Sequence, residues 1–286
     1  MSLARLAVCF ALVATASACL RERPSPVARR AEPVAAPTPT AAPAPPAPTP
    51  PPAPPVAAPQ APPEAAPTVP VRFVVRTVGA PSTERLPLII ALHGLGDSPE
   101  NFIGLYTEMG LRVRVAAAAG LDRYGDGYSW FPSRAGTPHA AWVAGIRRAA
   151  DAVIPEIRRV ARENPTCGLP IVTGFSQGGM LSYAIVARPD GGVFAALPIG
   201  GLLPRELWPA ARDIGGLLPA VHAFHGTADE RVPFASDREA NEAFRAVGYP
   251  AELHEYAGVG HTITPGMQSD VQARLRAALA NVGCAN

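Results

Sequence analysis

The sequence predicts an α/β domain built on a mainly parallel sheet, with helices on both faces. Three observations indicate it. Short apolar strands alternate with helices along residues 71–286, turn-forming residues end most strands, and no internal repeat interrupts the pattern. Such an alternation is typical of parallel strands joined by crossover helices. This length suffices for one core, so we expect a single catalytic or binding domain.

The individual elements follow from residue periodicity. The clearest helix covers residues 139–162, where apolar residues such as Ile146, Val153 and Ile157 recur at three- and four-residue steps between charged ones. Runs of β-branched or aliphatic residues that end in turn formers predict the strands. The predicted strands are residues 72–78, 86–92, 113–118, 169–175, 193–198, 220–224 and 251–256, and the other predicted helices are 177–187, 236–247 and 265–280.

The first 70 residues are expected to lie outside this domain. Residues 1–18 carry one early charge, an apolar run and terminal small residues, which is typical of a secretory signal peptide. Cys19 follows those small residues as in the lipobox of bacterial lipoproteins, so we expect a lipidated protein anchored in a cell-envelope membrane. The alternative is a secreted soluble protein. Of the chain's 35 prolines, 19 lie in residues 24–70, which predicts that residues 19–70 form a disordered Pro/Ala-rich linker.

The cysteines suggest one disulfide. Removing the leader with Cys9 leaves Cys19, Cys167 and Cys284, and lipidation of Cys19 would leave an even number in an oxidising compartment. Cys167 precedes a predicted strand and Cys284 follows the last helix. Both are therefore expected at the edge opposite the one where open α/β sheets place their sites. We predict that they are bonded, and two separate buried thiols are the alternative.

Charge excludes several functions. All 25 basic residues are arginine, which excludes a P-loop lysine, a Schiff-base lysine and a Ser-Lys dyad. From residue 71 onward, 20 arginines balance 20 acidic residues, so the domain has no net charge. Nucleic acid is not an expected partner, because it requires a basic surface.

One glycine-rich turn has the form of a nucleophile motif. Gly174-Phe175-Ser176-Gln177-Gly178 lies between a predicted strand and a predicted helix. In that context the glycines avoid collisions at a sharp turn, which aims the serine hydroxyl at the amino end of the helix. Ser176 is therefore the candidate nucleophile, and an idle serine in a glycine-rich turn is the alternative.

A serine nucleophile needs a base and an orienting carboxylate. His261 follows the last strand in a glycine-containing loop, whereas His222, His225 and His254 fall within or at the ends of strands, where structural roles are usual. Asp229 comes just after a strand, at the edge where such sheets place their sites. Asp190, Asp213 and Asp237 also lie between the serine and His261. The order Ser176, Asp229, His261 is that of α/β-hydrolases.

A second loop could stabilise negative charge. Residues 92–97, Leu-His-Gly-Leu-Gly-Asp, follow an earlier strand, and their glycines allow backbone N–H groups to approach a reacting acyl oxygen. We expect the amides of Leu95 and Gln177 to form an oxyanion hole. His93 is expected to brace this loop.

Together these segments resemble the phospholipase/carboxylesterase family of α/β-hydrolases, which includes acyl-protein thioesterases. The resemblance rests on LHGLGDSPENF at residues 92–102, GFSQGGM at 174–180, HGTADERVP at 225–233 and YAGVGHTIT at 256–264, and it covers roughly residues 72–281. It implies the same triad and oxyanion amides, and a tryptophan near the acyl site at Trp130. The sequence departs from the family at Pro132 and at Glu230-Arg231, where substrate contacts are expected to differ.

The expected function is a serine carboxylesterase that forms an acyl-enzyme on Ser176 and uses no metal or cofactor. Its substrate would be a small-molecule or polymer-bound ester. One alternative is a polysaccharide or polyester deacylase of the feruloyl or polyhydroxybutyrate esterase type. Acyl thioesterase or lysophospholipase activity, and a non-enzymatic binding protein with the same fold, are further alternatives.

Access to the serine is expected to be open. The segment between residues 198 and 220 is too short for a large cap domain. We expect Trp130, Phe131 and Trp208 to line a groove for modest acyl groups.

Overall fold

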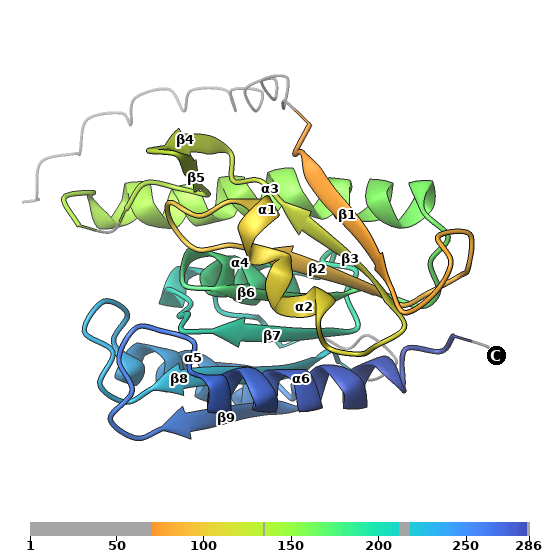
Figure 1. Cartoon of the computed structure of the whole chain (residues 1–286). Helices are drawn as coiled ribbons and strands as arrows, with labels where there is room; N and C mark the ends of the chain where they lie inside the picture. Colours follow the sequence, from red (N-terminus) through yellow and green to blue (C-terminus); the bar gives the residue numbers. More distant parts are fainter. Residues whose placement is uncertain (1–69, 134, 212–217, 285–286) are drawn as a thin grey trace, which may run out of the picture. The chain divides into compact units, whose positions relative to one another are not determined.

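The computed structural model describes residues 70–133, 135–211 and 218–284. The predicted signal peptide, Cys19 and nearly all of the proline-rich linker lie outside the described residues. The domain is built on a seven-stranded sheet of order β1-β3-β2-β6-β7-β8-β9, covered by helices (Figure 1). Strand β1 is antiparallel to β3, and the other neighbouring strands are parallel. The predicted mainly parallel sheet is confirmed.

The predicted elements are present with small shifts at their ends. The sheet consists of β1 (Phe73–Val78), β2 (Leu88–Leu92), β3 (Val113–Ala118), β6 (Ile171–Phe175), β7 (Ala195–Ile199), β8 (Ala220–Gly226) and β9 (Ala251–Tyr256), and the predicted helices are α3 (His139–Glu163), α4 (Gln177–Val186), α5 (Phe234–Ala246) and α6 (Pro265–Leu279). Four short elements and a 3₁₀ turn were not predicted. They are α1 (Pro99–Phe102), α2 (Gly104–Thr107), the hairpin of β4 (Asp122–Tyr124) and β5 (Gly127–Ser129), and η1 (Arg205–Leu207).

The sheet divides the core into two layers. All five residues of β2 are buried, because both of its faces are covered. Leu88, Ile90 and Leu92 belong to a buried cluster that includes residues of α3, α4 and α5, whereas Ile89 and Ala91 belong to a second cluster with residues of α1, α2 and α6. This alternation follows from side chains pointing to opposite faces along a strand. Figure 1 shows α6 and α3 on opposite sides of the sheet.

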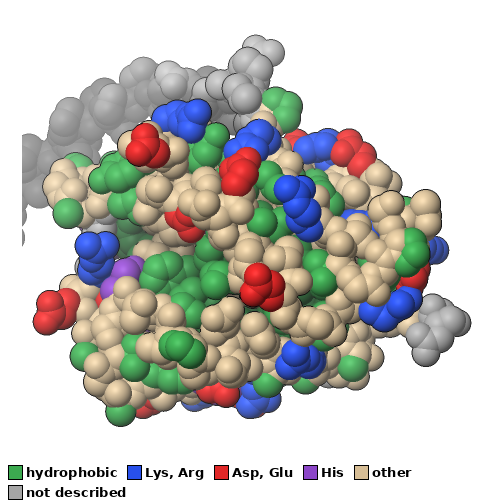
Figure 2. Space-filling model, in the orientation of Figure 1, with side chains coloured by type: hydrophobic (Ala, Val, Ile, Leu, Met, Phe, Trp, Pro, Cys, Tyr) green, Lys and Arg blue, Asp and Glu red, His purple; other side chains and the backbone are tan. Residues whose placement is uncertain are grey.

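The surface agrees with the charge balance of the domain. On the face drawn in Figure 2, acidic and basic side chains are interspersed rather than gathered by sign.

In the segment between β7 and β8, the described residues form one regular element, the turn η1, and Leu202 and Leu203 are buried in the core. None of the helices in the described part of the chain combines the length and apolar character needed to span a bilayer.

Cys167 and Cys284 form a disulfide, with a Cα–Cα distance of 5.1 Å. Cys167 precedes β6, and Cys284 follows α6, so the bond joins the C-terminal end of the domain to the amino-terminal end of a central strand. The bonded residues are separated by 117 positions. A bond that closes so long a loop removes much of the conformational entropy of the unfolded chain.

We predict that Cys284→Ser lowers the free energy of unfolding by about 5 kcal/mol, the chain-entropy value for a loop of this length. Denaturant unfolding of the oxidised wild type and the variant measures the difference. Wild-type protein treated with a reductant serves as a control and should unfold like the variant. Equal stability of oxidised wild type and variant, or two freely alkylated thiols in the unreduced protein, would contradict the assignment.

Candidate active site

Ser176 occupies a strained turn between β6 and α4. Its φ is 57°, and it is the one residue other than glycine with positive φ in the described parts of the chain. Glycines on both sides make this turn possible. A Cβ at Gly174 would lie 2.5 Å from the Gly178 carbonyl oxygen, and a Cβ at Gly178 would collide with the Leu92 carbonyl oxygen. The backbone therefore holds the serine side chain at the carboxyl edge of the sheet, where the sequence motif predicted it.

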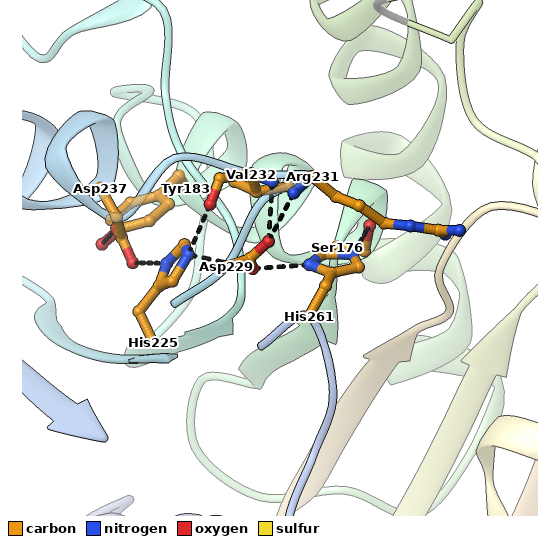
Figure 3. Close-up of polar contacts among 8 residues, drawn as sticks. All are labelled: Ser176, Tyr183, His225, Asp229, Arg231, Val232, Asp237 and His261. Atoms are coloured by element: carbon orange, nitrogen blue, oxygen red, sulfur yellow. Dashed lines mark hydrogen bonds and ion pairs between the residues drawn. The ribbon is translucent and has the colours of Figure 1, made fainter. Parts of the chain in front are cut away.

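Ser176, His261 and Asp229 form a continuous hydrogen-bonded chain (Figure 3). The Ser176 Oγ lies 2.9 Å from His261 Nε2, and His261 Nδ1 lies 2.6 Å from Asp229 Oδ2. The carboxylate accepts from Nδ1–H, which leaves Nε2 able to accept the serine proton. The His261 ring also lies against Phe175, with ring centroids 4.8 Å apart. This arrangement is that of a nucleophile, a base and its orienting acid.

Asp229 is buried and held on every side by donors. Its side chain is 1% exposed. Its Oδ1 accepts from the backbone N–H groups of Arg231 and Val232, each at 2.9 Å. These two bonds fix the carboxylate in a turn just after β8. An ionised carboxyl group with several N–H donors can remain charged inside a protein, because the bonds replace its water.

A second histidine, His225, contacts the other side of this carboxylate. Its Nε2 lies 2.9 Å from the Val232 carbonyl oxygen and 3.2 Å from Asp229 Oδ2. Both neighbours are acceptors, so Nε2 carries a proton. Its Nδ1 lies 2.6 Å from Asp237 Oδ2, and the Tyr183 hydroxyl donates to Asp237 Oδ1 at 2.6 Å. The chain of polar contacts in Figure 3 thus extends from Ser176 to Tyr183.

The pair of His225 and Asp237 shares one proton. Burial disfavours the charged imidazole, but the hydrogen bond and charge of Asp237 outweigh it and raise the pKa of His225. Burial also raises the pKa of Asp237. Whichever group holds the proton, His225 Nε2–H still points at Val232 and Asp229. His225 was expected to be structural. Its contact with Asp229 shows that it also lies against one side of the candidate acid.

The other acids considered from the sequence do not reach His261. Asp237 lies on the buried face of α5 and pairs with His225, while Asp190 pairs with Arg188. Asp213 lies outside the described residues. The sequence contained a signal for the His225–Asp237 pair that we missed. Asp237 lies three, four and seven positions before Ala240, Asn241 and Phe244, which are the other buried residues of α5. This helical spacing predicts that the Asp237 carboxyl group is buried and therefore has a buried polar partner.

The candidate oxyanion amides border the same groove as Ser176. Leu95 follows β2, and Gln177 begins α4, where its N–H has no partner within the helix. Among the described residues, no acceptor is bonded to the backbone N–H of either residue. His93 holds the loop as expected: its Nδ1 donates to the Gly94 carbonyl oxygen at 2.6 Å, and its Nε2 accepts from Gly120 N–H at 3.0 Å.

The Gln177 side chain has a separate role that the sequence did not reveal. Its Oε1 accepts from Trp130 N–H at 3.0 Å, and its Nε2 donates to the Phe131 carbonyl oxygen at 2.8 Å. The side chain is buried, so these bonds fix the 130–131 backbone beside the nucleophile turn. One residue thus offers a backbone N–H to the groove and supports the groove's wall.

The groove beside Ser176 has a volume of about 740 Å³, and its lining corrects part of the sequence prediction. Phe131 lines it, as predicted, together with Phe175, Met180 and Trp142. Trp130 does not, because it is fully buried and its Nε1–H donates to the His93 carbonyl oxygen. Trp208 lies in a separate cavity of about 230 Å³. Of the residues at which the sequence departs from the family, Glu230 and Arg231 line the groove and Pro132 does not.

The buried His225–Asp237 pair predicts a pattern of stabilities. His225→Leu should lower the free energy of unfolding by about 3–5 kcal/mol, because it leaves a carboxyl group buried without its partner. Replacing both residues by leucine should recover most of that loss. Tyr183→Phe removes one hydrogen bond and should cost about 1–2 kcal/mol. Denaturant unfolding tests these values, and a double variant as unstable as His225→Leu would contradict the pairing.

Known proteins are similar to parts of the chain, over 94 to 218 residues. It is 27% identical over 218 residues to the "Probable carboxylesterase" of Oryza sativa subsp. japonica, a match covering 68% of this chain and 78% of that protein. It is 33% identical over 94 residues to acyl-protein thioesterase 1 of Debaryomyces hansenii, covering 32% of this chain and 40% of the relative.

Solved structures agree with these relatives. Esterase PE8 matches with a TM-score of 0.63 and 25% identity, over 74% of this chain and all of that one. The Bacillus cereus carboxylesterase has the same fold, with a TM-score of 0.60 and 16% identity, over 73% of this chain and 94% of its own. The family model "Phospholipase/Carboxylesterase" matches residues 75–279. The chain is therefore a hydrolase of the phospholipase/carboxylesterase family, with an α/β-hydrolase fold.

Proposed function

We propose that this protein is a serine carboxylesterase that hydrolyses short-chain carboxylic esters through an acyl-enzyme on Ser176. The observation that carries the proposal is the unbroken chain of hydrogen bonds from Ser176 through His261 to the buried Asp229. Membership of a carboxylesterase family supports the same chemistry. A solvent-accessible groove at the serine provides room for the substrate.

Each residue has a defined part in the proposed reaction. The Ser176 hydroxyl attacks the ester carbonyl carbon and passes its proton to His261 Nε2, while Asp229 stabilises the resulting imidazolium. The amides of Leu95 and Gln177 donate to the oxyanion. His261 then protonates the departing alkoxide. The alcohol leaves, and the acyl group stays on Ser176 as an ester. A water molecule, deprotonated by His261, then attacks this acyl-enzyme, and His261 returns the proton to Ser176 Oγ as the acid leaves.

The groove favours modest acyl groups. Its apolar side chains Phe131, Trp142, Phe175 and Met180 suit an acyl chain, while Glu230 and Arg231 add charge to the wall. Each buried methylene contributes about 0.8 kcal/mol, so a few carbons suffice for useful selectivity. A thioester substrate is the second candidate, favoured by the similarity to an acyl-protein thioesterase.

We also propose that the protein acts at a cell-envelope membrane, attached through a lipidated Cys19. The small residues before Cys19 and the proline-rich linker behind it support this location. Several acyl chains would give stable attachment, whereas a single chain is marginal. In that location carboxylic esters would be more accessible than intracellular thioesters.

For catalysis, Ser176→Ala and His261→Ala should each lower kcat by roughly 10³-fold or more, and Asp229→Asn should have a smaller effect. The assay uses p-nitrophenyl acetate and butyrate, with a butyryl thioester in parallel to separate the two substrate classes. Ser269→Ala, an exposed serine on α6, is the matched control and should retain full activity. Wild-type turnover by purified Ser176→Ala would show that the nucleophile is wrong.

For the anchor, Cys19→Ala should move the protein from the detergent-rich phase to the aqueous phase in a detergent partition experiment, because it removes the site of lipidation. Its esterase activity should not change. Wild-type protein recovered from the medium with an unmodified amino-terminal cysteine would exclude the anchor.

A further inference from the structure

Two histidines and a glutamate gather at the edge of the sheet, outside the candidate active site. His222 lies near the start of β8, and Glu252 and His254 lie in β9. His222 is directly opposite Glu252 in the register of these parallel strands. Because side chains alternate along a strand, Glu252 and His254 project from the same face, which His222 shares. We call these three residues the edge cluster.

The atoms of the edge cluster that could bind a metal lie within 4.8 Å of one another. Glu252 Oε2 is 3.4 Å from His222 Nδ1 and 3.6 Å from His254 Nε2. Zinc bound to nitrogen and oxygen at about 2.0–2.1 Å in a tetrahedron separates its ligand atoms by roughly 3.3 Å. Two of the three separations are thus close to this value, and a small rotation of the rings would shorten the third.

The two ring nitrogens are buried and make no well-formed hydrogen bond, only the long contacts with Glu252 Oε2. Among the described residues, three buried side-chain polar atoms have no hydrogen-bond partner, and two of them are His222 Nδ1 and His254 Nε2. A buried polar atom without a partner costs free energy, so such atoms call for an explanation. Here both point toward the same carboxylate and toward each other. A shared ligand would satisfy them together.

We propose that His222, Glu252 and His254 form a binding site for a divalent transition-metal ion of the zinc class. Two imidazole nitrogens and one carboxylate oxygen suit zinc, whereas calcium and magnesium prefer oxygen ligands alone. The Glu252 side chain is 51% exposed, so an ion and its remaining water can enter from solvent.

Arg274 on α6 would compete with the metal ion for the Glu252 carboxylate. Its Nη2 lies 3.1 Å from Glu252 Oε2, and its side chain is 41% exposed. Asp270, also on α6, accepts from the Tyr256 hydroxyl, so it is already engaged. An ion bound to Glu252 would displace the guanidinium, and the exposed arginine can swing into solvent. The site would then connect β8 to the edge strand β9 and stabilise the folded domain.

The test uses the full chain without a polyhistidine tag, stripped of metal and titrated with zinc by calorimetry and with cobalt by visible absorption. Zinc at about 100 times its dissociation constant should raise the melting temperature by about 5 °C or more. His254→Ala and Glu252→Gln should each weaken zinc binding about 100-fold. Arg274→Gln should strengthen it about tenfold, because the competing charge is gone.

The matched control is His139→Ala. His139 also lies beside a carboxylate, Glu206, but on the exposed surface and outside the edge cluster, so this variant should bind zinc like the wild type. Zinc binding that is unchanged in both His254→Ala and Glu252→Gln would overturn the proposal, as would a melting temperature that does not respond to zinc. In either case the cluster is an ion-pair network with Arg274 only.

Discussion

The arrangement around Ser176 depends on one buried charge, the carboxylate of Asp229. It is bonded to His261 on one side, to two backbone N–H groups on the second and approached by His225 on the third. Without these donors an ionised carboxyl group in this position would cost several kcal/mol. The turn that supplies the backbone donors comes directly after β8, and the His225 ring is held by α5 through Asp237. The orientation of His261 therefore depends also on residues outside the candidate active site, including Asp237 on α5.

The conformation of the backbone also determines how the residues around Ser176 are arranged. The parallel strands end at one edge, which brings residues from β2, β6, β8 and the segment after β9 together although they are far apart in the sequence. At Ser176 the chain adopts a strained conformation that the packing of β6 and α4 maintains, since glycines at 174 and 178 allow a close approach. Strain of this kind persists at a site because the surrounding structure fixes it. It exposes the serine side chain at the groove.

Much of this was predictable from the sequence, for identifiable reasons. Apolar periodicity and turn residues predicted the sheet and its helices, and four motifs at the ends of strands predicted which side chains would meet. The short hairpin of β4 and β5 was missed, although Gly125-Asp126 between its strands is a turn signal. Trp130 was misplaced because a motif does not reveal which way an aromatic ring points. The hydrogen bonds of Gln177 and His93, which turn that ring inward, depend on residues distant in sequence.

The same limit of sequence-based prediction applies to the lining of the groove and to the edge cluster. Trp142 belongs to a helix whose periodicity predicted a buried residue, yet it also lines the groove. His222 and His254 were expected to be structural histidines because they lie in strands. Only the register of β8 against β9 reveals that they face a common carboxylate. Cross-strand neighbours depend on sheet register, which periodicity alone does not determine.

The central claim is that the buried Asp229 and His261 activate Ser176 as a nucleophile. Its most direct test is treatment of the folded protein with a fluorophosphonate, followed by peptide mass spectrometry of the adduct. We expect a single stoichiometric modification at Ser176, at a rate that falls at least 100-fold in His261→Ala, since a serine without its base reacts slowly. Labelling of another residue, or equally fast labelling of Ser176 in His261→Ala, would contradict the account.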